Sequence, residues 1–378
     1  MGIFLKQIIS LVAAALLIVF SGCGLNQSDS GLSDSGISMY FMEVGNADCC
    51  LVKCGDEYML IDGGNNNDAD FVCGYLDSIG VDKLKYVVAT HPHEDHIGSL
   101  DDVLYNVGAE TVIMPDCEYT SEDGRNLLQA ITTAGAKTEY ADVGDTYTLS
   151  DASFEILGPI QITSDVNANS VVLRLDYNGV SALFMGDAES SSEEQMLDAG
   201  LITDIDILKV GHHGSREGSS YRFLREAMPE YAVISTSEGN SYGHPHDEAI
   251  SRLEDCGAKV YRTDIQGGIV ISTEGDSINV KTDGGETENP IVPNTADENI
   301  SENETESSSE SNTVAPSENT DGTEQNETYN AAYIGNINSK IYHKEECRSL
   351  PNEENRIYFS SKEEAEKQGY KACGNCKP

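Results

Sequence analysis

Six consecutive residues, His91-Pro92-His93-Glu94-Asp95-His96, follow the apolar run Tyr86-Val87-Val88-Ala89, where a buried strand should end. Pro92 restrains its own φ and keeps His91 out of the helical region, so the segment leaves the strand extended. In extended backbone, residues two apart point the same way, so His91 and His93 converge. Asp95 and His96 stand where a helix should begin. The spacing predicts two imidazoles for one cation and a carboxylate with an imidazole for a second; a solvated polar loop is the alternative.

A carboxylate and a histidine pair follow two later apolar strands. Asp187 emerges from the strand Ser181–Met185 at a glycine turn, where it is well placed to bridge two cations. Its alternative role is to cap the helix that follows. His212 and His213 lie in a glycine turn after the strand Ile205–Val210. We assign His213 to the metal and His212 to the substrate, and the reverse order stays open.

Two further histidines flank Pro245 in the stretch Tyr242-Gly243-His244-Pro245-His246. The proline keeps His244 extended, so both imidazoles should project to one side. His246 opens a predicted helix, Asp247–Cys256, whose positive end favours an anionic ligand. We expect His246, or alternatively His244, to bind a phosphoryl oxygen or to protonate the leaving group. A packing histidine with a capping role is the other interpretation.

The segment from His91 to His96 resembles the H-x-H-x-D-H signature of the metallo-β-lactamase fold. The Asn169-Ser170 pair, the Gly-His-His turn and the Y-G-H-P-H stretch resemble the branch that contains the nuclease-like domain of DNA-uptake (competence) proteins and phosphorylcholine esterases. The resemblance covers residues 37–282 and implies an α/β fold, a four-layer αβ/βα sandwich. It also implies that Asp187 is the bridging carboxylate. The expected metal ligands are His91, His93, Asp95, His96, Asp187 and His213.

The resemblance also indicates residues that support these ligands. Asp48 ends a glycine loop that should lie beside the active site, with His244 near it. Asp62 ends a strand and should orient a ligand histidine, although it can also bind the amides of the Gly-Gly turn that follows it. Asn169 stands where many enzymes of the fold carry another metal histidine. The site of His91 and His93 should therefore be one protein ligand short.

The order of strands also predicts how the two sheets are completed. Alternating or apolar runs at Ile37–Val44, Cys49–Val52 and Tyr58–Ile61 should open the first sheet. The runs at Lys259–Tyr261 and Gly268–Ile271 are expected to complete the second sheet.

The chain divides by composition into five parts. Residues 1–22, with an apolar run from Ile8 to Phe20, resemble a lipoprotein signal peptide, and Cys23 would then be lipidated. An uncleaved anchor or a plain secretion signal is the alternative, and each places the protein outside the cytoplasm. Residues 23–36 are a predicted flexible tether and 37–282 a hydrolase domain. Residues 283–330 hold no Lys or Arg, which predicts a disordered acidic linker before a small module at 331–378.

The C-terminal module carries the pattern of a structural zinc site. Cys373 and Cys376 form a C-x2-C pair, and His343 with Cys347 can complete four ligands. So few residues bury too little surface to fold without help, which a zinc ion would supply. The module resembles the zinc-binding domain of the Ada DNA-repair proteins. A disulfide between Cys373 and Cys376 is the alternative.

Together with the signal-peptide pattern, the resemblance to these families implies a lipid-anchored, extracytoplasmic metal-dependent hydrolase. The net charge of −42 weighs against tight, non-specific nucleic-acid binding but does not exclude phosphodiester chemistry at bound cations. We expect two divalent ions, Zn or Mn, and two-metal hydroxide attack on a phosphodiester, with DNA as the first candidate. Asp95, His212 and His246 are the expected catalytic residues. The alternatives are a phosphorylcholine esterase or other cell-wall phosphodiesterase, and a non-catalytic surface DNA-binding lipoprotein. No obligate protein partner is inferred.

Overall fold

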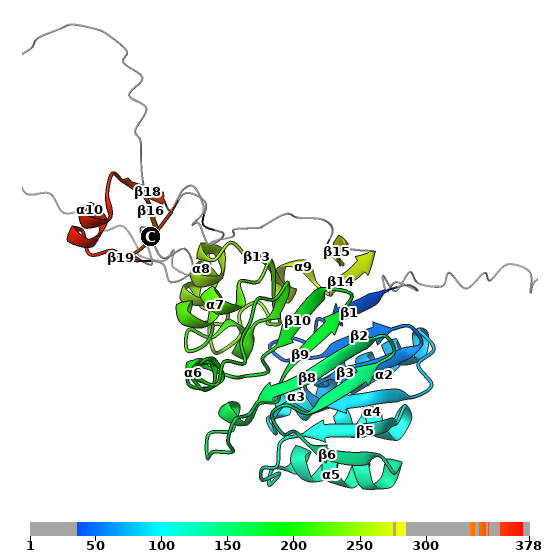
Figure 1. The fold of residues 1–378 in the computed structure, drawn as a ribbon. Helices are drawn as coiled ribbons and strands as arrows, with labels where there is room; N and C mark the ends of the chain where they lie inside the picture. Colours follow the sequence, from blue (N-terminus) through cyan, green and yellow to red (C-terminus); the bar gives the residue numbers. More distant parts are fainter. Residues whose placement is uncertain are drawn as a thin grey trace, which may run out of the picture.

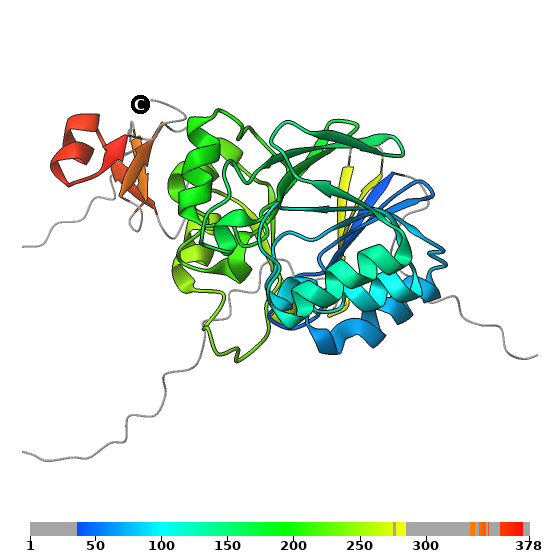
Figure 2. The ribbon, with the colours of Figure 1, turned by 90° about the horizontal axis from the view of Figure 1, so that it is seen from below.

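Two β-sheets lie face to face and carry helices on both outer sides (Figure 1). The structure, a computed structural model, describes residues 36–274, 277–284, 333–336, 340–344, 347 and 356–372. In Figure 2 the blue and cyan helices of the first half separate from the green helices of the second, with the sheets between them. The predicted four-layer αβ/βα architecture is confirmed.

The first sheet has the strand order β15-β14-β1-β2-β3-β4-β5-β6. Its strands from β3 to β6 are parallel, whereas those from β15 to β3 are antiparallel. The bounds are β1 (Ile37–Phe41), β2 (Cys50–Cys54), β3 (Glu57–Ile61), β4 (Leu84–Val88), β5 (Ala109–Met114), β6 (Lys137–Tyr140), β14 (Ile269–Glu274) and β15 (Ser277–Thr282).

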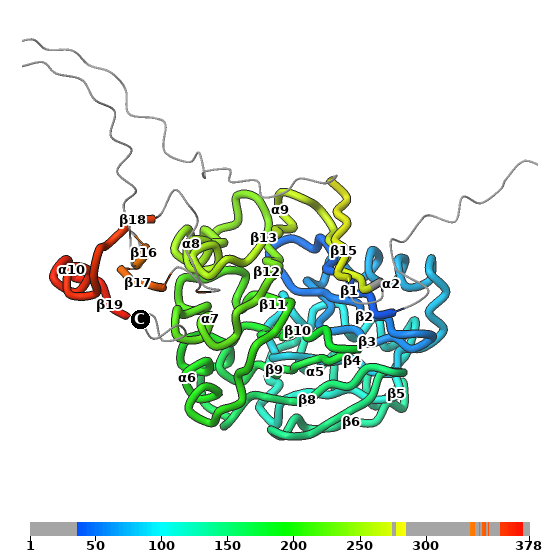
Figure 3. The backbone as a smooth tube through the Cα atoms, turned by 45° about the horizontal axis from the view of Figure 1, so that its top comes forward, coloured from blue at the N-terminus to red at the C-terminus, as the bar shows by residue number. Residues whose placement is uncertain are grey.

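The second sheet has the order β13-β12-β11-β10-β9-β8-β7, and its strands from β10 to β13 are parallel. The tube in Figure 3 follows β9 to β13 side by side. The bounds are β7 (Thr146–Leu149), β8 (Ala152–Gly158), β9 (Val172–Tyr177), β10 (Val180–Phe184), β11 (Ile207–Lys209), β12 (Tyr231–Ile234) and β13 (Lys259–Arg262).

One strand lies in a different sheet from the one that the sequence predicted. The run Gly268–Ile271 was expected in the second sheet, but β14 pairs antiparallel with β1 in the first, with Met39 opposite Ile271. The short helix α9 (Thr263–Gln266) connects β13, at the edge of the second sheet, to β14 in the first sheet. Strand patterning alone does not distinguish the two sheets, because both bury one face in the same core.

Helices cover the outer face of each sheet because their apolar sides bury against it. Val72, Leu100 and Leu127 pack on the first sheet, and Met196 and Phe223 on the second. Between the sheets, the rings of Phe41 and Phe184 stack with centroids 6.1 Å apart. The helices are α2 (Ala69–Ser78), α3 (Glu94–Ile97), α4 (Leu100–Asn106), α5 (Glu122–Ala134), α6 (Ser190–Asp198), α7 (Tyr221–Ala227) and α8 (Asp247–Asp255).

The described C-terminal residues form a small sheet of order β18-β16-β17-β19 with one helix. Tyr342, Phe359, Ala365 and Tyr370 make its small apolar core. The elements are β16 (Tyr333–Asn336), β17 (Ile341–His343), β18 (Arg356–Phe359), α10 (Lys362–Lys367) and β19 (Lys371–Ala372). Among the helices that the structure describes, none is both long and apolar enough to cross a membrane.

Candidate metal centre

The polar residues of the sequence motifs gather where parallel strands of both sheets end. Asp62 follows β3, the histidine segment follows β4, Asp187 follows β10 and the Gly-His-His turn follows β11. The carboxyl ends of parallel strands meet at one edge of a sheet, where loops are free to carry ligands. Facing sheets therefore bring residues more than a hundred positions apart into one site.

His91 and His93 converge as the extended backbone predicts. Nε2 of His91 lies 3.0 Å from Nδ1 of His93, and the two rings are edge to face. His91 is fully buried, while His93 is exposed at the mouth of the site. These two imidazoles and one oxygen of Asp187 form a set whose ligand atoms all lie within 4.8 Å of one another.

Asp187 lies between two groups of histidines and is 2% exposed. Its Oδ2 is 3.7 Å from Nε2 of His91, and its Oδ1 is 3.2 Å from Nε2 of His96 and 3.6 Å from Nε2 of His213. One carboxylate thus offers an oxygen to each side. This is the arrangement that a bridging ligand between two cations requires.

The turn before Asp187 needs a glycine. Gly186 has a φ of 52°, and a Cβ on it would lie 3.0 Å from Cβ of Ser170 and 3.1 Å from Cβ of Thr90. Ser170 Oγ accepts a hydrogen bond from the Asp187 N–H at 3.0 Å and lies 3.4 Å from Nδ1 of His91. Ser170 therefore fixes both the bridging carboxylate and a ligand histidine.

Asn169 does not take the position that the sequence analysis expected beside the metals. Its Oδ1 accepts from the Thr163 N–H at 2.8 Å, and its Nδ2 donates to the Thr163 carbonyl at 3.0 Å. The side chain braces its own loop, which contains the 3-10 turn η2 (Asn167–Asn169). The next residue, Ser170, makes the contacts with the site instead.

Asp95, His96 and His213 form a second set with ligand atoms within 4.8 Å of one another. Oδ2 of Asp95 lies 3.4 Å from Nε2 of His213. His213 is buried in the 3-10 turn η3 (Gly211–Gly214), in which His212 and His213 have φ of 48° and 51°. Two consecutive residues in the left-handed region are strained, and strain of this kind collects at functional sites.

Asp62 supports His96 in the way that the sequence analysis expected. Its Oδ2 lies 2.8 Å from Nδ1 of His96, so Nε2 is left to face the site. Thr90, which we had not singled out, binds Asp62 through both its N–H (2.8 Å) and its hydroxyl (2.7 Å). Burial alone would lower the pKa of His96, but the Asp187 and Asp62 carboxylates outweigh burial and hold it well above its ordinary value.

Three buried groups hold His213 in place: the Ser235 carbonyl, the Asp48 carboxylate and, behind Asp48, the Lys209 ammonium. Its Nδ1 lies 3.0 Å from the Ser235 carbonyl and 3.4 Å from Oδ1 of Asp48, and Oδ2 of Asp48 pairs with Nζ of Lys209 at 2.7 Å. Both Asp48 and Lys209 are 4% exposed. Burial alone would raise the pKa of Asp48, but Lys209 and His213 hold it well below its ordinary range. Asp48 was predicted from the sequence, whereas Lys209 was not; its signal is a lysine inside the apolar strand β11.

His212 lies on the open side of the site and outside both ligand sets. Its Nδ1 pairs with Oε1 of Glu189 at 2.7 Å, and its Nε2 is 3.6 Å from Oδ2 of Asp187. Burial would lower its pKa, but the Glu189 hydrogen bond and the Asp187 charge raise it above the ordinary value. Glu189 is a further residue that the sequence analysis had not singled out.

Of the two histidines considered for the substrate-facing role, His244 is the one whose ring contacts those of His212 and His213. The His244 ring lies 5.2 Å from the ring of His212 and 6.1 Å from that of His213, whereas His246 contacts the His244 ring at 5.0 Å. Nδ1 of His246 accepts the Arg216 N–H at 3.1 Å. His244 therefore stands between His246 and the histidines of the Gly-His-His turn. Burial and the neighbouring His212 and His213 lower the pKa of His244 to about 4.

Unsatisfied polar atoms at the centre fit bound cations. Nε2 of His96, Oδ1 of Asp187 and Nε2 of His213 are buried and make no hydrogen bond in the described structure. Oδ1 of Asp187 lies 3.2 Å from Nε2 of His96 and 3.6 Å from Nε2 of His213. Buried polar atoms of this kind cost free energy unless a partner satisfies them. Imidazoles and carboxylates are ligands that suit zinc, manganese or iron.

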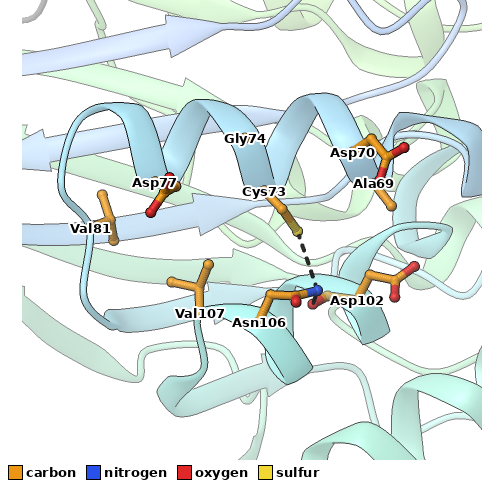
Figure 4. A pocket seen from close by; sticks show the side chains of 9 residues that line it. All are labelled: Ala69, Asp70, Cys73, Gly74, Asp77, Val81, Asp102, Asn106 and Val107. Atoms are coloured by element: carbon orange, nitrogen blue, oxygen red, sulfur yellow. Dashed lines mark hydrogen bonds between the residues drawn. The ribbon is translucent and has the colours of Figure 1, made fainter.

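A separate hollow lies between α2 and α4, with a cavity volume of about 470 Å³ (Figure 4). Asp70, Asp77 and Asp102 line it, and Cys73 accepts from Asn106 Nδ2 at 4.0 Å. It contains none of the ligand residues. The hollow is therefore separate from the candidate metal centre.

In the C-terminal module, His343 and Cys347 are buried and lie together. Nδ1 of His343 is 3.4 Å from Sγ of Cys347, as two ligands of one ion would be. The other two expected ligands, Cys373 and Cys376, and the lipidation residue Cys23 lie outside the described residues.

Comparisons with known proteins agree with this geometry. Residues 42–238 match the model of the metallo-beta-lactamase superfamily, and residues 323–378 match that of the metal binding domain of Ada. The chain is 30% identical over 196 residues to ComE operon protein 3 of Bacillus subtilis, covering 52% of this chain and 25% of that protein.

Two other relatives are similar over comparable stretches. Competence protein ComA of Neisseria gonorrhoeae is 26% identical over 279 residues, 69% of this chain and 38% of that protein. Recombination protein 2 of Haemophilus influenzae is 27% identical over 208 residues, 55% of this chain and 24% of that protein. This chain therefore spans between about a quarter and two fifths of the relatives' length. The chain carries an Ada-like zinc-binding domain at its C-terminus. Its main domain belongs to the metallo-beta-lactamase superfamily, and the chain is a metal-dependent hydrolase related to competence proteins.

Proposed function

We propose that this hydrolase is a phosphodiesterase that cleaves nucleic-acid strands, with DNA as the first candidate. One observation carries the proposal: the two oxygens of buried Asp187 face two separate sets of ligands, 3.7 Å and 3.2 Å away at their nearest. A pair of cations at such a site would supply a Lewis acid and an activated water for in-line displacement at phosphorus. The ions would be held by His91, His93 and Asp187 on one side and by Asp95, His96, His213 and Asp187 on the other.

The residues around the ligands have distinct tasks in this proposal. Asp95 is part-exposed at the mouth of the site, where its carboxylate can accept a hydrogen bond from the attacking water. His212 is held at Nδ1 by Glu189, and the Glu189 and Asp187 carboxylates raise its pKa, which favours the protonated ring. That proton can be donated to a phosphoryl oxygen, or to the leaving oxygen as the P–O bond breaks. His244 lies beside His212 and takes the substrate-facing role that we had given to His246.

The choice of substrate class rests on the relatives and on the site. One relative is named for competence and another for recombination, which favours nucleic acid. The rest of the chain is acidic, so the site itself must attract the phosphodiester. A lipid anchor at Cys23 would hold the enzyme at the outer side of the bacterial membrane, and a zinc ion bound by His343, Cys347, Cys373 and Cys376 would stabilise the terminal module.

Hydrolysis by the full chain, purified in detergent, tests the proposal. With added Mn²⁺ or Zn²⁺ the protein should cleave bis-p-nitrophenyl phosphate and single-stranded DNA, and should leave a cephalosporin intact. Asp187→Asn should lose at least about a thousandfold in kcat, because it weakens the ligand shared by both sets. His343→Ala, which alters only the terminal module, is the matched control and should retain turnover.

Three other outcomes of these assays would contradict the proposal, and two of them would favour a different function. Rapid cephalosporin turnover without diester cleavage would refute the proposal. Cleavage of phosphorylcholine esters alone would favour the cell-wall alternative. Tight DNA binding without any turnover, with both cations bound, would make the chain a binding lipoprotein.

A further inference from the structure

The loop between β12 and α8, from Ser235 to His246, is fixed by one side chain, Asn240. Its Nδ2 donates to the carbonyls of Ser237 and His244 at 2.8 and 2.5 Å. Its Oδ1 accepts the N–H groups of Tyr242 and His244 at 3.1 and 3.0 Å. Because both halves of the loop bind the same amide, the backbone at Tyr242 is held in one conformation.

Tyr242 is an exposed aromatic residue at the tip of this loop. Its side chain is 68% exposed, more than Tyr105 or Tyr140, at 50% and 52%. The ring lies nearly parallel to that of His244, with 21° between the planes and 5.6 Å between the centroids. The ring of Tyr242 therefore lies beside that of His244, and most of the residue is open to solvent, which leaves ring surface accessible to a ligand.

His244 connects Tyr242 to the metal centre. Its ring lies edge to face with His212 at 5.2 Å and nearly parallel to His213 at 6.1 Å. A continuous series of rings thus runs from a ligand histidine through His244 to the open face of Tyr242. A substrate whose phosphorus lies at the cations would bring its neighbouring group over this face.

We infer that Tyr242 is the platform on which a base of the substrate stacks, next to the phosphodiester that is cleaved. The inference rests on the proposed function and names its substrate class: strands with planar heterocycles, read by stacking and not by sequence. Single-strand binding proteins use exposed aromatic rings in this way, because every base has a π-face. A ring held in advance loses little conformational entropy when the base arrives.

The charge of the protein gives a physical reason for this mode of binding. A chain with a net charge of −42 gains little long-range attraction for a polyanion. Stacking between uncharged rings does not depend on that attraction and is little screened by salt. Binding energy from Tyr242 would therefore supplement the cations where basic residues do not.

The test compares two diesters with the same leaving group, using the full chain with Mn²⁺. One is thymidine 5′-(p-nitrophenyl phosphate), and the other is methyl p-nitrophenyl phosphate, which has no base. In Tyr242→Ala the ratio of kcat/KM for the thymidine ester to that for the methyl ester should fall about tenfold, mostly through KM, as loss of one stacked base predicts. Tyr242→Phe, which keeps the ring, should retain the wild-type ratio.

Tyr140→Ala is the matched control, since it removes another exposed tyrosine, from β6. An unchanged ratio in Tyr242→Ala, or an equal loss in Tyr242→Phe, would overturn the inference. The second result would mean that the hydroxyl, and not the ring, matters.

Binding of a short labelled oligothymidine, measured by fluorescence anisotropy, separates this inference from the proposed function. If the wild-type protein cleaves neither ester, the proposed phosphodiesterase activity fails, and the anisotropy decides about Tyr242. Affinity that falls about tenfold in Tyr242→Ala and is kept in Tyr242→Phe would support the platform. Equal affinity in all three proteins would reject it.

Discussion

Lys209 shows how a single buried charge can govern a metal ligand that it does not touch. It pairs with Asp48 at 2.7 Å, and Asp48 in turn faces Nδ1 of His213 at 3.4 Å. The partners of metal-binding histidines fix the orientation of the ring and its basicity. Lys209 therefore sets the charge of Asp48 and, through it, the position of His213.

Lys209→Met tests this role. Removing one member of a buried ion pair leaves Asp48 uncompensated and should cost about 3–5 kcal/mol in the free energy of unfolding. The affinity of the second cation should fall about 10- to 100-fold. Urea unfolding and metal titration measure the two effects. Lys85→Met, which breaks a partly exposed pair with Glu57, is the control and should cost about 0–1 kcal/mol with no change in metal affinity.

Alanine substitutions at the adjacent residues Ser170 and Asn169 should have different effects on metal binding. Ser170→Ala removes the acceptor of the Asp187 N–H and should cost about 1–2 kcal/mol of metal binding, measured by titration of the first cation. Asn169→Ala breaks only contacts within its own loop and should leave both cations bound. The reverse pattern would return Asn169 to the position that the sequence analysis gave it.

The sequence could predict the site residues whose arrangement is set by neighbours within a few positions along the chain. Pro92 and the extended backbone were enough to bring His91 and His93 together, and the pattern gave all six members of the two ligand sets. Thr90, Ser170, Glu189 and Lys209 were missed, because each is defined by a partner far along the chain. The sequence left open which of His244 and His246 lies next to His212, since the direction of the loop depends on the bonds of Asn240, which no local rule supplies.

At the scale of elements, the strand pair β14 and β15 decides how the first sheet ends. The strand β14 was predicted from its sequence but assigned to the other sheet, because the alternation of buried residues is the same on either side of a shared core. The strand β15 was not predicted. The observed register places Ser38 to Phe41 opposite Ser272 to Ile269, so β14 protects the edge of β1. An apolar strand left at an open edge is prone to aggregation.

This pairing predicts different outcomes for two truncations. A chain that stops at Gly268 loses β14 and β15, exposes β1 and should aggregate or unfold. A chain that stops at Gly284 keeps both strands and should remain folded, with cooperative thermal unfolding measured by circular dichroism. Equal solubility and melting of the two chains would show that β14 contributes nothing to the first sheet.

At the scale of the whole molecule, the chain concentrates its histidines within a very acidic protein. Seven of the eight histidines belong to the segments that form the metal centre, and the eighth, His343, lies in the terminal module. Four carboxylates, those of Asp48, Asp62, Asp95 and Asp187, also meet there. Bound cations would compensate charges that otherwise repel one another, so the fold and the hydrolase activity depend on the same ions.

Metal content measured together with activity in Asp187→Ala tests the central claim most directly. The wild-type chain should lose about two equivalents of divalent metal on this substitution, together with all diester hydrolysis, because one carboxylate serves both ligand sets. The zinc of the terminal module and the far-ultraviolet circular dichroism should stay the same. An Asp187→Ala protein that keeps its full metal content and its wild-type turnover would contradict the account of a two-cation hydrolase.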